Sequence, residues 1–288
     1  MHVITIIGCG DIGQRVAARY QQKGSLVRGL VQTRTSAEAL QKHNIEPIEA
    51  NLDDPASLDE IDYKQNTLFY FAPPPRSGTK DTRMANWLTS IRPNNLPNKV
   101  VLISTTAVYG DSGGDWIDEN SPLEPGTERG LRRLDAESRL SQWAKNNEVP
   151  YVILRVPGIY GPGRLPRERL EKALPVLNES ECGFTNRIHS DDLAMICVTA
   201  AERANSGDVF NVSDGHPGTM TDWFNQVADA LALHRPPQVS MQEAEQVMTA
   251  GMLSYLKESR RIDNAKMLTE LNIELAYKTI KEGIRASK

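Results

Sequence analysis

Near its N-terminus the chain carries Val3-Ile4-Thr5-Ile6-Ile7-Gly8-Cys9-Gly10-Asp11-Ile12-Gly13. A run of apolar, β-prone residues is followed at once by glycines at the first, third and sixth places of GxGxxG, and then by an amphipathic stretch. The pattern predicts a strand, a glycine turn and a helix in that order. In such a turn Gly8 makes the sharp bend, Gly10 lets the backbone approach a pyrophosphate, and Gly13 lets helix and strand pack closely. We therefore expect a dinucleotide-binding fold; the alternative is a glycine turn with no ligand.

The composition is that of a globular protein without a nucleic-acid or membrane partner. Of its 288 residues, 39% are hydrophobic and 24% charged, and the net charge is -4 with no block of Lys or Arg, so neither role has an electrostatic footprint. The apolar runs are too short to cross a bilayer. The first strand begins too early to leave room for a cleavable signal. Three cysteines make a disulfide framework unexpected, and these features together predict a cytoplasmic protein.

Metal binding is not expected from this sequence. The five histidines show no HxxxH spacing and no CxxC pair is present, so the usual zinc-binding patterns are missing.

Apolar strands alternate with helical patterns from residue 3 to residue 156. This alternation predicts an α/β fold with a doubly wound parallel sheet of the Rossmann type, covered by helices on both faces. Beyond Pro157 the pattern loosens into short mixed elements. We expect residues 1–156 to form the dinucleotide-binding domain, with returning segments near 184–213. Residues 157–288 should mainly form a smaller C-terminal lobe over the carboxyl edge of the sheet, where such folds bind ligands.

Four further stretches resemble one known family. They are VLISTTAVYG (101–110), LRVPGIYGPG (154–163), RIHSDDL (187–193) and SRRIDNAK (259–266), and they follow the glycine turn in the family's order. Together they are similar to the extended short-chain dehydrogenases/reductases, which include the sugar-nucleotide epimerases and dehydratases. The resemblance implies a Rossmann fold, a bound NAD(P) and a small-molecule substrate.

The catalytic pair of that family is absent here. Relatives carry Tyr-x-x-x-Lys on the helix after the fifth strand, with a nearby Ser or Thr that hydrogen-bonds the reacting oxygen. Thr105 holds the Ser/Thr place, but Arg129 stands for the tyrosine and Arg133 for the lysine. A guanidinium keeps its proton throughout the working pH range, so Arg129 cannot act as the general base. This departure resembles the atypical branch of the family, whose members keep the glycine turn and often lack the pair.

Three side chains, or a bound water molecule, are candidates to move the proton instead. Tyr109 follows Thr105 by four residues, Tyr160 lies at the mouth of the sixth strand, and His189 has a pKa in the useful range. The resemblance also gives each a structural alternative. The tyrosines belong to stretches that are usually structural or close to the cofactor, and His189 more often holds a loop against the following helix.

The cofactor preference is predicted from the end of the second strand. NAD-preferring relatives have an acidic residue there, whereas this chain has Thr33 and Arg34, which could accept a 2'-phosphate. NADP is therefore favoured over NAD; the alternative is that Arg34 points to solvent. By resemblance, the cofactor-binding residues are Gly8, Cys9, Gly10, Asp11, Ile12, Gly13, Thr33, Arg34, Asn51, Leu52, Ala72, Pro73, Ser104, Thr105, Pro157 and Ile159.

Arginines are the candidate substrate ligands. Arg76, Arg129, Arg133 and Arg164 would suit an anionic or nucleotide-bearing substrate if they face one cleft. Arg129 and Arg133 lie one helical turn apart. The equal alternative is that they belong to a solvated basic stretch of an exposed helix and bind no ligand.

Two functions remain open at this point. The first is an NAD(P)-binding oxidoreductase or epimerase acting on a small polar or nucleotide-bearing metabolite. The alternative is a non-catalytic regulator that senses a dinucleotide or binds a partner. By resemblance, a homodimer formed through the helices after the fourth and fifth strands is a candidate assembly, although Trp87 and Trp143 on those helices could equally be core residues.

Overall fold

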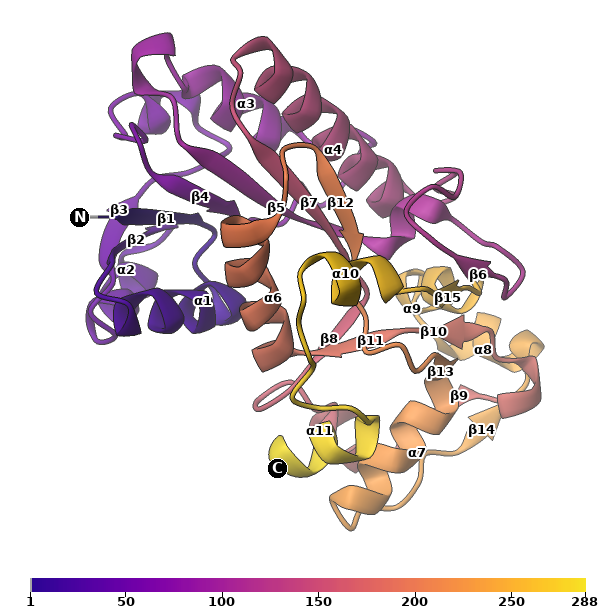
Figure 1. Cartoon of the computed structure of the whole chain (residues 1–288). Helices are drawn as coiled ribbons and strands as arrows, with labels where there is room; N and C mark the ends of the chain where they lie inside the picture. Colours follow the sequence, from indigo (N-terminus) through magenta and orange to yellow (C-terminus); the bar gives the residue numbers. More distant parts are fainter. Residues whose placement is uncertain (1) are drawn as a thin grey trace.

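A computed structural model describes residues 2–288 of the chain (Figure 1). Its centre is one parallel sheet of seven strands in the order β12-β7-β5-β4-β1-β2-β3. The strands are β1 (Val3–Ile7), β2 (Leu26–Val31), β3 (Glu46–Glu49), β4 (Thr67–Tyr70), β5 (Lys99–Thr105), β7 (Tyr151–Val156) and β12 (Asp208–Asn211). The strand order reverses between β1 and β4, and ligands bind at such a reversal in open α/β sheets, at the carboxyl ends of the strands. The predicted Rossmann-type fold is confirmed.

Helices cover both faces of the sheet. On one face α1 (Asp11–Gln22), α2 (Arg34–Gln41) and α6 (Ser190–Arg203) share a core with the strands. On the other face α3 (Thr82–Ser90) and α4 (Glu128–Asn146) do the same (Figure 1). Every residue of β4 and β7 is buried, which explains why these strands are apolar without alternation. Trp87 on α3 is fully buried in the core of the α3–α4 face, and Trp143 on α4 packs against that core.

A second, smaller core lies below the carboxyl edge of the sheet. It is built from Tyr160, Leu170, Val176, Trp223, Phe224, Val227, Ala228 and Ile284. The main elements around it are β8 (Gly158–Tyr160), α5 (Arg167–Glu171), β9 (Val176–Leu177), α7 (Met220–Ala230) and α11 (Ile280–Ala286). Between α7 and α11 the chain returns to the sheet, where Met267 and Leu271 join the core of the α1–α6 face.

Short pairings connect the two parts. β11 (Arg187–His189) pairs with β8, β15 (Arg261–Ile262) with β6 (Trp116–Ile117), β10 (Phe184–Thr185) with β13 (Gly218–Thr219), and β14 (Gln238–Val239) with β9. The helices of this region are α8 (Met241–Val247), α9 (Ala250–Leu256) and α10 (Ala265–Glu270). Short 3-10 turns cover Pro55–Leu58, Pro93–Asn95, Thr106–Tyr109 and Glu179–Glu181.

Across residues 2–288, no helix combines the length and the apolar character needed to span a bilayer. In the same residues, no cluster of His, Cys, Asp and Glu side chains could hold a metal ion.

A buried ion pair fixes α4 to the sheet. Arg155 on β7 and Glu137 on α4 are 5% and 4% exposed, and Arg155 Nη2 lies 2.9 Å from Glu137 Oε2. Arg155 Nη1 also donates to the Tyr109 hydroxyl at 2.9 Å, and that hydroxyl donates to Asn211 Oδ1 at 2.7 Å. The Ser104 hydroxyl bonds the other Glu137 oxygen. The network therefore links α4 to β5, β7 and β12.

Breaking this pair should destabilise the whole domain. Arg155→Met leaves the Glu137 carboxylate buried without a cation, and we expect it to lower the free energy of unfolding by about 3–5 kcal/mol. Chemical denaturation measures the loss. The matched control is Arg235→Met, which removes an arginine from an exposed pair with Asp229 and should leave the free energy of unfolding nearly unchanged. Equal losses in the two variants would contradict the central role of the buried pair.

Candidate functional site

The glycine turn joins β1 to α1 and leaves part of its backbone open. Gly8 has φ +84°, and a Cβ atom there would lie 2.6 Å from the backbone of Ala72. At Gly13 a Cβ atom would press on Ile6 and Cys9 at 3.1–3.2 Å. At Gly10 a Cβ atom would meet nothing within 4 Å, and no side chain caps the N-terminus of α1. The turn therefore offers open backbone at a helix N-terminus, which attracts a phosphate group.

A groove of about 430 Å³ continues from this turn over the carboxyl ends of β1, β2 and β4. Seven of the predicted cofactor residues line it: Gly8, Cys9, Gly10, Asn51, Leu52, Ala72 and Pro73. Gln14, Gln32, Ser36 and Arg83 also line it and were not predicted. Gln32 could have been found, since it directly follows β2. Arg83 gives no local signal, because it comes from α3 and is held there by Asp53 at 2.6 Å.

Thr33 and Arg34, the predicted readers of a 2'-phosphate, lie outside the lining of this groove. The Thr33 hydroxyl caps α2 by accepting a hydrogen bond from Ser36 N. The Arg34 side chain is 77% exposed and pairs with Glu38 and Glu49 at 3.3 and 3.2 Å. Exposed pairs of this kind contribute little stability, so a stronger anion could draw the guanidinium away from them.

The other residues predicted around the turn do not line the groove, and they pack or pair beside the turn. Ile12 and Gly13 are buried beneath it. Asp11 forms ion pairs with Arg15 and with Arg164 of the C-terminal part. Burial opposes ionisation of Asp11, but the hydrogen bonds from Arg164 and Arg15 outweigh it and lower the pKa of this carboxyl.

A second pocket, of about 480 Å³, lies at the carboxyl ends of β5 and β7 and is partly covered by α9. Among the predicted residues, Thr105, Pro157, Ile159, Arg129 and Arg164 line it. Other lining residues come from distant segments: Phe184, Asn186, Arg187, Met220, Tyr255, Glu258 and Arg260.

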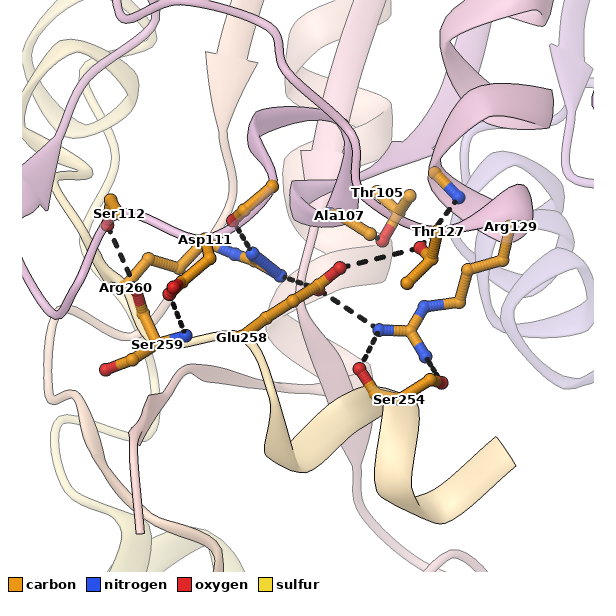
Figure 2. Close-up of polar contacts among 12 residues, drawn as sticks. Thr105, Ala107, Asp111, Ser112, Thr127, Arg129, Ser254, Glu258, Ser259 and Arg260 are labelled. Carbon is orange, nitrogen blue, oxygen red and sulfur yellow. Dashed lines mark hydrogen bonds and ion pairs between the residues drawn. The ribbon is translucent and has the colours of Figure 1, made fainter. Parts of the chain in front are cut away.

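Arg129, which the sequence resemblance aligns with the tyrosine, is held by the segment around α9 (Figure 2). Its Nη1 donates to Ser254 Oγ at 2.7 Å, its Nη2 lies 3.1 Å from Glu258 Oε2, and its guanidinium sits 3.5 Å from the centre of the Tyr255 ring. Arg260 binds the same Glu258 oxygen. One carboxylate in the lining of the pocket is thus shared by two arginines.

The other two predicted substrate arginines do not line this pocket. Arg133 Nη1 donates to the carbonyl of Ala72 at 3.3 Å, at the end of β4, and burial lowers the pKa of its guanidinium while Asp81 opposes the change. Arg76 is exposed in the loop after β4. Arg129 and Arg133 therefore engage different partners.

Thr105 is the one member of the predicted catalytic set that lines the pocket. Its Oγ1 accepts a hydrogen bond from Ala107 N at 3.3 Å. Tyr109 belongs to the buried network, where burial raises its pKa to about 12 despite the nearby Arg155. Ser104 belongs to the same network.

Tyr160 belongs to the smaller core beyond the sheet and His189 packs against it, and neither residue lines either cavity. The Tyr160 ring packs edge-on against His189 and Trp223 with centroids 5.2 and 5.1 Å apart. Burial raises the pKa of Tyr160 and lowers the pKa of His189. His189 Nδ1 accepts a hydrogen bond from Asp191 N at 3.2 Å, as the cap of α6.

Substitutions of the first two glycines should separate folding from ligand binding. Gly8→Ala forces a Cβ atom onto Ala72 at positive φ and should lower the free energy of unfolding by at least about 2 kcal/mol. Gly10→Ser has room and supplies a good helix cap, so stability should stay within about 1 kcal/mol of the wild type. Its side chain fills the open cradle and should abolish dinucleotide binding, measured by calorimetry. Normal binding by Gly10→Ser would contradict this role of the turn.

Known proteins share this architecture. A protein of unknown function from Silicibacter pomeroyi DSS superposes over 99% of this chain and 98% of its own, with a TM-score of 0.86 and 28% identity. The UDP-glucose 4-epimerase of Thermotoga maritima, solved with UDP-glucose, superposes over 99% and 97% with a TM-score of 0.80 and 18% identity, a similarity of fold alone.

Sequence comparison gives relatives with assigned activities. The human dTDP-D-glucose 4,6-dehydratase is 26% identical over 122 residues, which are 40% of this chain and 35% of that protein. The match thus spans about a third of the curated relative. A model of the NAD dependent epimerase/dehydratase family matches residues 4–213. The chain therefore belongs to the NAD dependent epimerase/dehydratase family.

Proposed function

We propose that the chain binds NADP, or NAD, in the groove above the glycine turn and acts on a small anionic metabolite in the neighbouring pocket. The open cradle at Gly10 carries this proposal, because a side chain at that position would fill the space that a pyrophosphate needs. When bound, the nicotinamide would donate or accept a hydride. Gly8, Gly10 and the first turn of α1 would hold the pyrophosphate, and Asn51 and Leu52 would line the adenosine side.

The charge of the second pocket supports an anionic substrate. Its lining holds four arginines, Arg129, Arg164, Arg187 and Arg260, against one glutamate, Glu258. Arginine binds carboxylate and phosphate groups through paired hydrogen bonds. A small polar or nucleotide-bearing metabolite fits this balance. The structure of the Thermotoga maritima UDP-glucose 4-epimerase, which has a similar fold, contains UDP-glucose.

The proposed chemistry does not use a tyrosine on α4. The Thr105 hydroxyl would hydrogen-bond the reacting oxygen of the substrate. Since Tyr109, Tyr160 and His189 lie outside the lining of the pocket, we favour a water molecule as the carrier of the proton. Both Arg129 and Arg260 already pair with Glu258, so we assign this carboxylate to binding the arginines.

NADP is the favoured cofactor because β2 is followed by Gln32 where NAD-preferring relatives carry an acid. A carboxylate there would bind the ribose hydroxyls and repel a 2'-phosphate. Gln32 removes that repulsion, and Arg34 supplies a cation two residues later.

A non-catalytic regulator is the second candidate function. The arrangement of Arg129 favours it, since the position of the proton donor is filled by a cation bonded to Ser254 and Glu258. Such a protein would use dinucleotide occupancy to change its affinity for a partner.

Thermal unfolding with NADP⁺, NADPH, NAD⁺ and NADH tests the binding proposal. A ligand at about 100 times its Kd adds about 2.7 kcal/mol of stability, so we expect a clear rise in Tm with the phosphorylated pair and a smaller rise with the other pair. Arg34→Ala should erase that difference, whereas Arg235→Ala should keep it. Stabilisation by none of the four would overturn the proposal, and equal stabilisation by all four in the wild type would overturn the NADP preference.

A carbonyl-substrate screen with NADPH separates the two functions. For an enzyme, oxidation of NADPH should fall by about 10²–10³-fold in Thr105→Val, because that variant loses a hydrogen bond to the reacting oxygen, while dinucleotide binding persists. For a regulator, no substrate would be turned over, and a purified partner would bind only one state of the dinucleotide site. Full activity of Thr105→Val would contradict the role given to this hydroxyl.

A further inference from the structure

The segment 245–257, which contains α9, covers part of the second pocket without belonging to a core. Met252 and Tyr255 line the pocket from this segment. Among the residues of the segment whose side chains are described, none is buried and none contributes to the apolar cores of the protein. A helix with so few buried apolar contacts has little local stability against opening.

Both ends of this segment are fixed to the rest of the chain. Before it, β14 pairs with β9, and Ala244 of α8 is buried. After it, Glu258 is buried. The next residue, Ser259, donates from its backbone N to Asp111 Oδ1 at 2.8 Å, and its carbonyl accepts from the Ser112 hydroxyl at 3.1 Å (Figure 2). The part of the chain that can move therefore lies between these anchors.

Arg129 on α4 makes the polar contacts between the segment and the body of the protein. Its Nη1 donates to Ser254 Oγ at 2.7 Å and its Nη2 to the Ser254 carbonyl at 3.4 Å (Figure 2). Its guanidinium lies 3.5 Å from the centre of the Tyr255 ring. In the part of the chain that the structure describes, the other hydrogen bonds and ion pairs of residues 245–257 stay within residues 241–257, as in the pair between Lys257 and Glu245. One arginine thus holds the segment over the pocket.

The wall of the pocket formed by β8 and β11 is rigid by comparison. Gly158 stands opposite Arg187 in the pairing of these strands, and both residues line the pocket. A Cβ atom at Gly158 would lie 2.7 Å from Arg187 Nη1, so this wall is packed without spare room. Asn186, beside it, donates from Nδ2 to the Arg260 carbonyl at 3.0 Å. Access to the pocket is therefore expected to change on the side of α9.

We propose that residues 245–257 form a lid that opens and closes over the second pocket, and that Arg129 is the latch that holds this lid closed. The opening itself does not depend on the proposed function, whereas control of ligand entry rests on the proposed function in taking the second pocket as the binding site. The latch combines charge-assisted hydrogen bonds with a cation–π contact, and one movement of α9 releases them together. Arg129 is thus a positioning residue, which acts on a ligand through α9.

Hydrogen exchange of the unliganded protein, followed on peptides by mass spectrometry, measures the opening. In the wild type the lid should exchange faster than α7, which has a buried face, because the lid opens locally. Arg129→Gln removes the charge and the forked donors, and it should speed exchange in the lid by at least about tenfold. The matched control is Arg139→Gln on the same helix, where Arg139 pairs with Asp135; it should leave the lid unchanged.

A second variant tests the latch from the lid, and it also serves if Arg129→Gln folds poorly. Tyr255 is 53% exposed, so Tyr255→Leu removes the stacked ring with little effect on the rest of the fold. It should also speed exchange in the lid, and the double variant should show less than the summed effect, because both changes release one contact. The latch is overturned if neither variant changes lid exchange, if their effects add, or if Arg129→Gln speeds α7 and the lid alike. Exchange in the wild-type lid as slow as in α7 would overturn the opening.

Thiol labelling tests whether the lid controls access. Ile159→Cys places a thiol in the lining of the pocket, where fluorescein maleimide reports entry. The protein without this substitution gives the background from its own thiols, including the half-buried Cys182. Adding Arg129→Gln should raise the labelling rate severalfold, because the closed lid shields the thiol. Faster exchange in the lid with unchanged labelling would overturn control of access.

These measurements separate the lid from the proposed function, since none of them needs a dinucleotide. Faster exchange and faster labelling in Arg129→Gln, with no stabilisation by NADP⁺, would support the lid and overturn dinucleotide binding. Stabilisation by NADP⁺ with exchange and labelling unchanged in Arg129→Gln would support dinucleotide binding and overturn the lid.

Discussion

The ion pair between Glu137 and Arg155 is the constraint on which the site depends. Both side chains are almost fully buried, so each charge is tolerated only because the other lies against it. Glu137 is on the same face of α4 as Arg129 and Arg133, at intervals of four residues. Fixing Glu137 against β7 therefore sets the rotation of the whole helix. Arg129 then points into the second pocket and Arg133 reaches the end of β4.

By the sequence resemblance, Arg129 and Arg133 stand on α4 where relatives carry the Tyr-Lys pair. Glu137 lies about two turns after Arg129 and one turn after Arg133 on α4, so its anchoring sets the direction of both positions. The type of side chain at position 129 then determines the chemistry at this point of the second pocket. A titrating phenol would exchange a proton there, whereas the guanidinium holds a permanent charge that gathers Ser254, Tyr255 and Glu258 from around α9.

The sequence was sufficient for features that depend on local geometry. The glycine turn follows from the spacing of its glycines, and the buried parallel strands of the sheet follow from their apolar runs. The structure contains both features. Side chains whose partners lie far along the chain were beyond such reasoning. Arg129 meets Glu258 across 129 residues and Arg164 meets Asp11 across 153, and no pattern within either segment announces the contact.

Tyr109 shows the same limit at short range. It follows Thr105 by four residues, which suggested a shared site, but the 3-10 turn Thr106–Tyr109 directs its hydroxyl toward Arg155 and Asn211. Arg34 likewise follows β2 as expected, yet the first turn of α2 places it beside Glu38 and Glu49. The position of a residue in the sequence therefore predicts where its backbone lies, whereas the local backbone conformation determines the direction of its side chain.

The close approach of Gly158 to Arg187 also has an evolutionary consequence. The two positions face each other across β8 and β11, and a Cβ atom at 158 would lie 2.7 Å from Arg187 Nη1, so a side chain there forces the guanidinium to move. Mutations at either position are therefore epistatic: a larger residue at 158 becomes acceptable once position 187 has shortened. Among descendants of this chain, the two sites should covary, with glycine retained wherever the arginine remains.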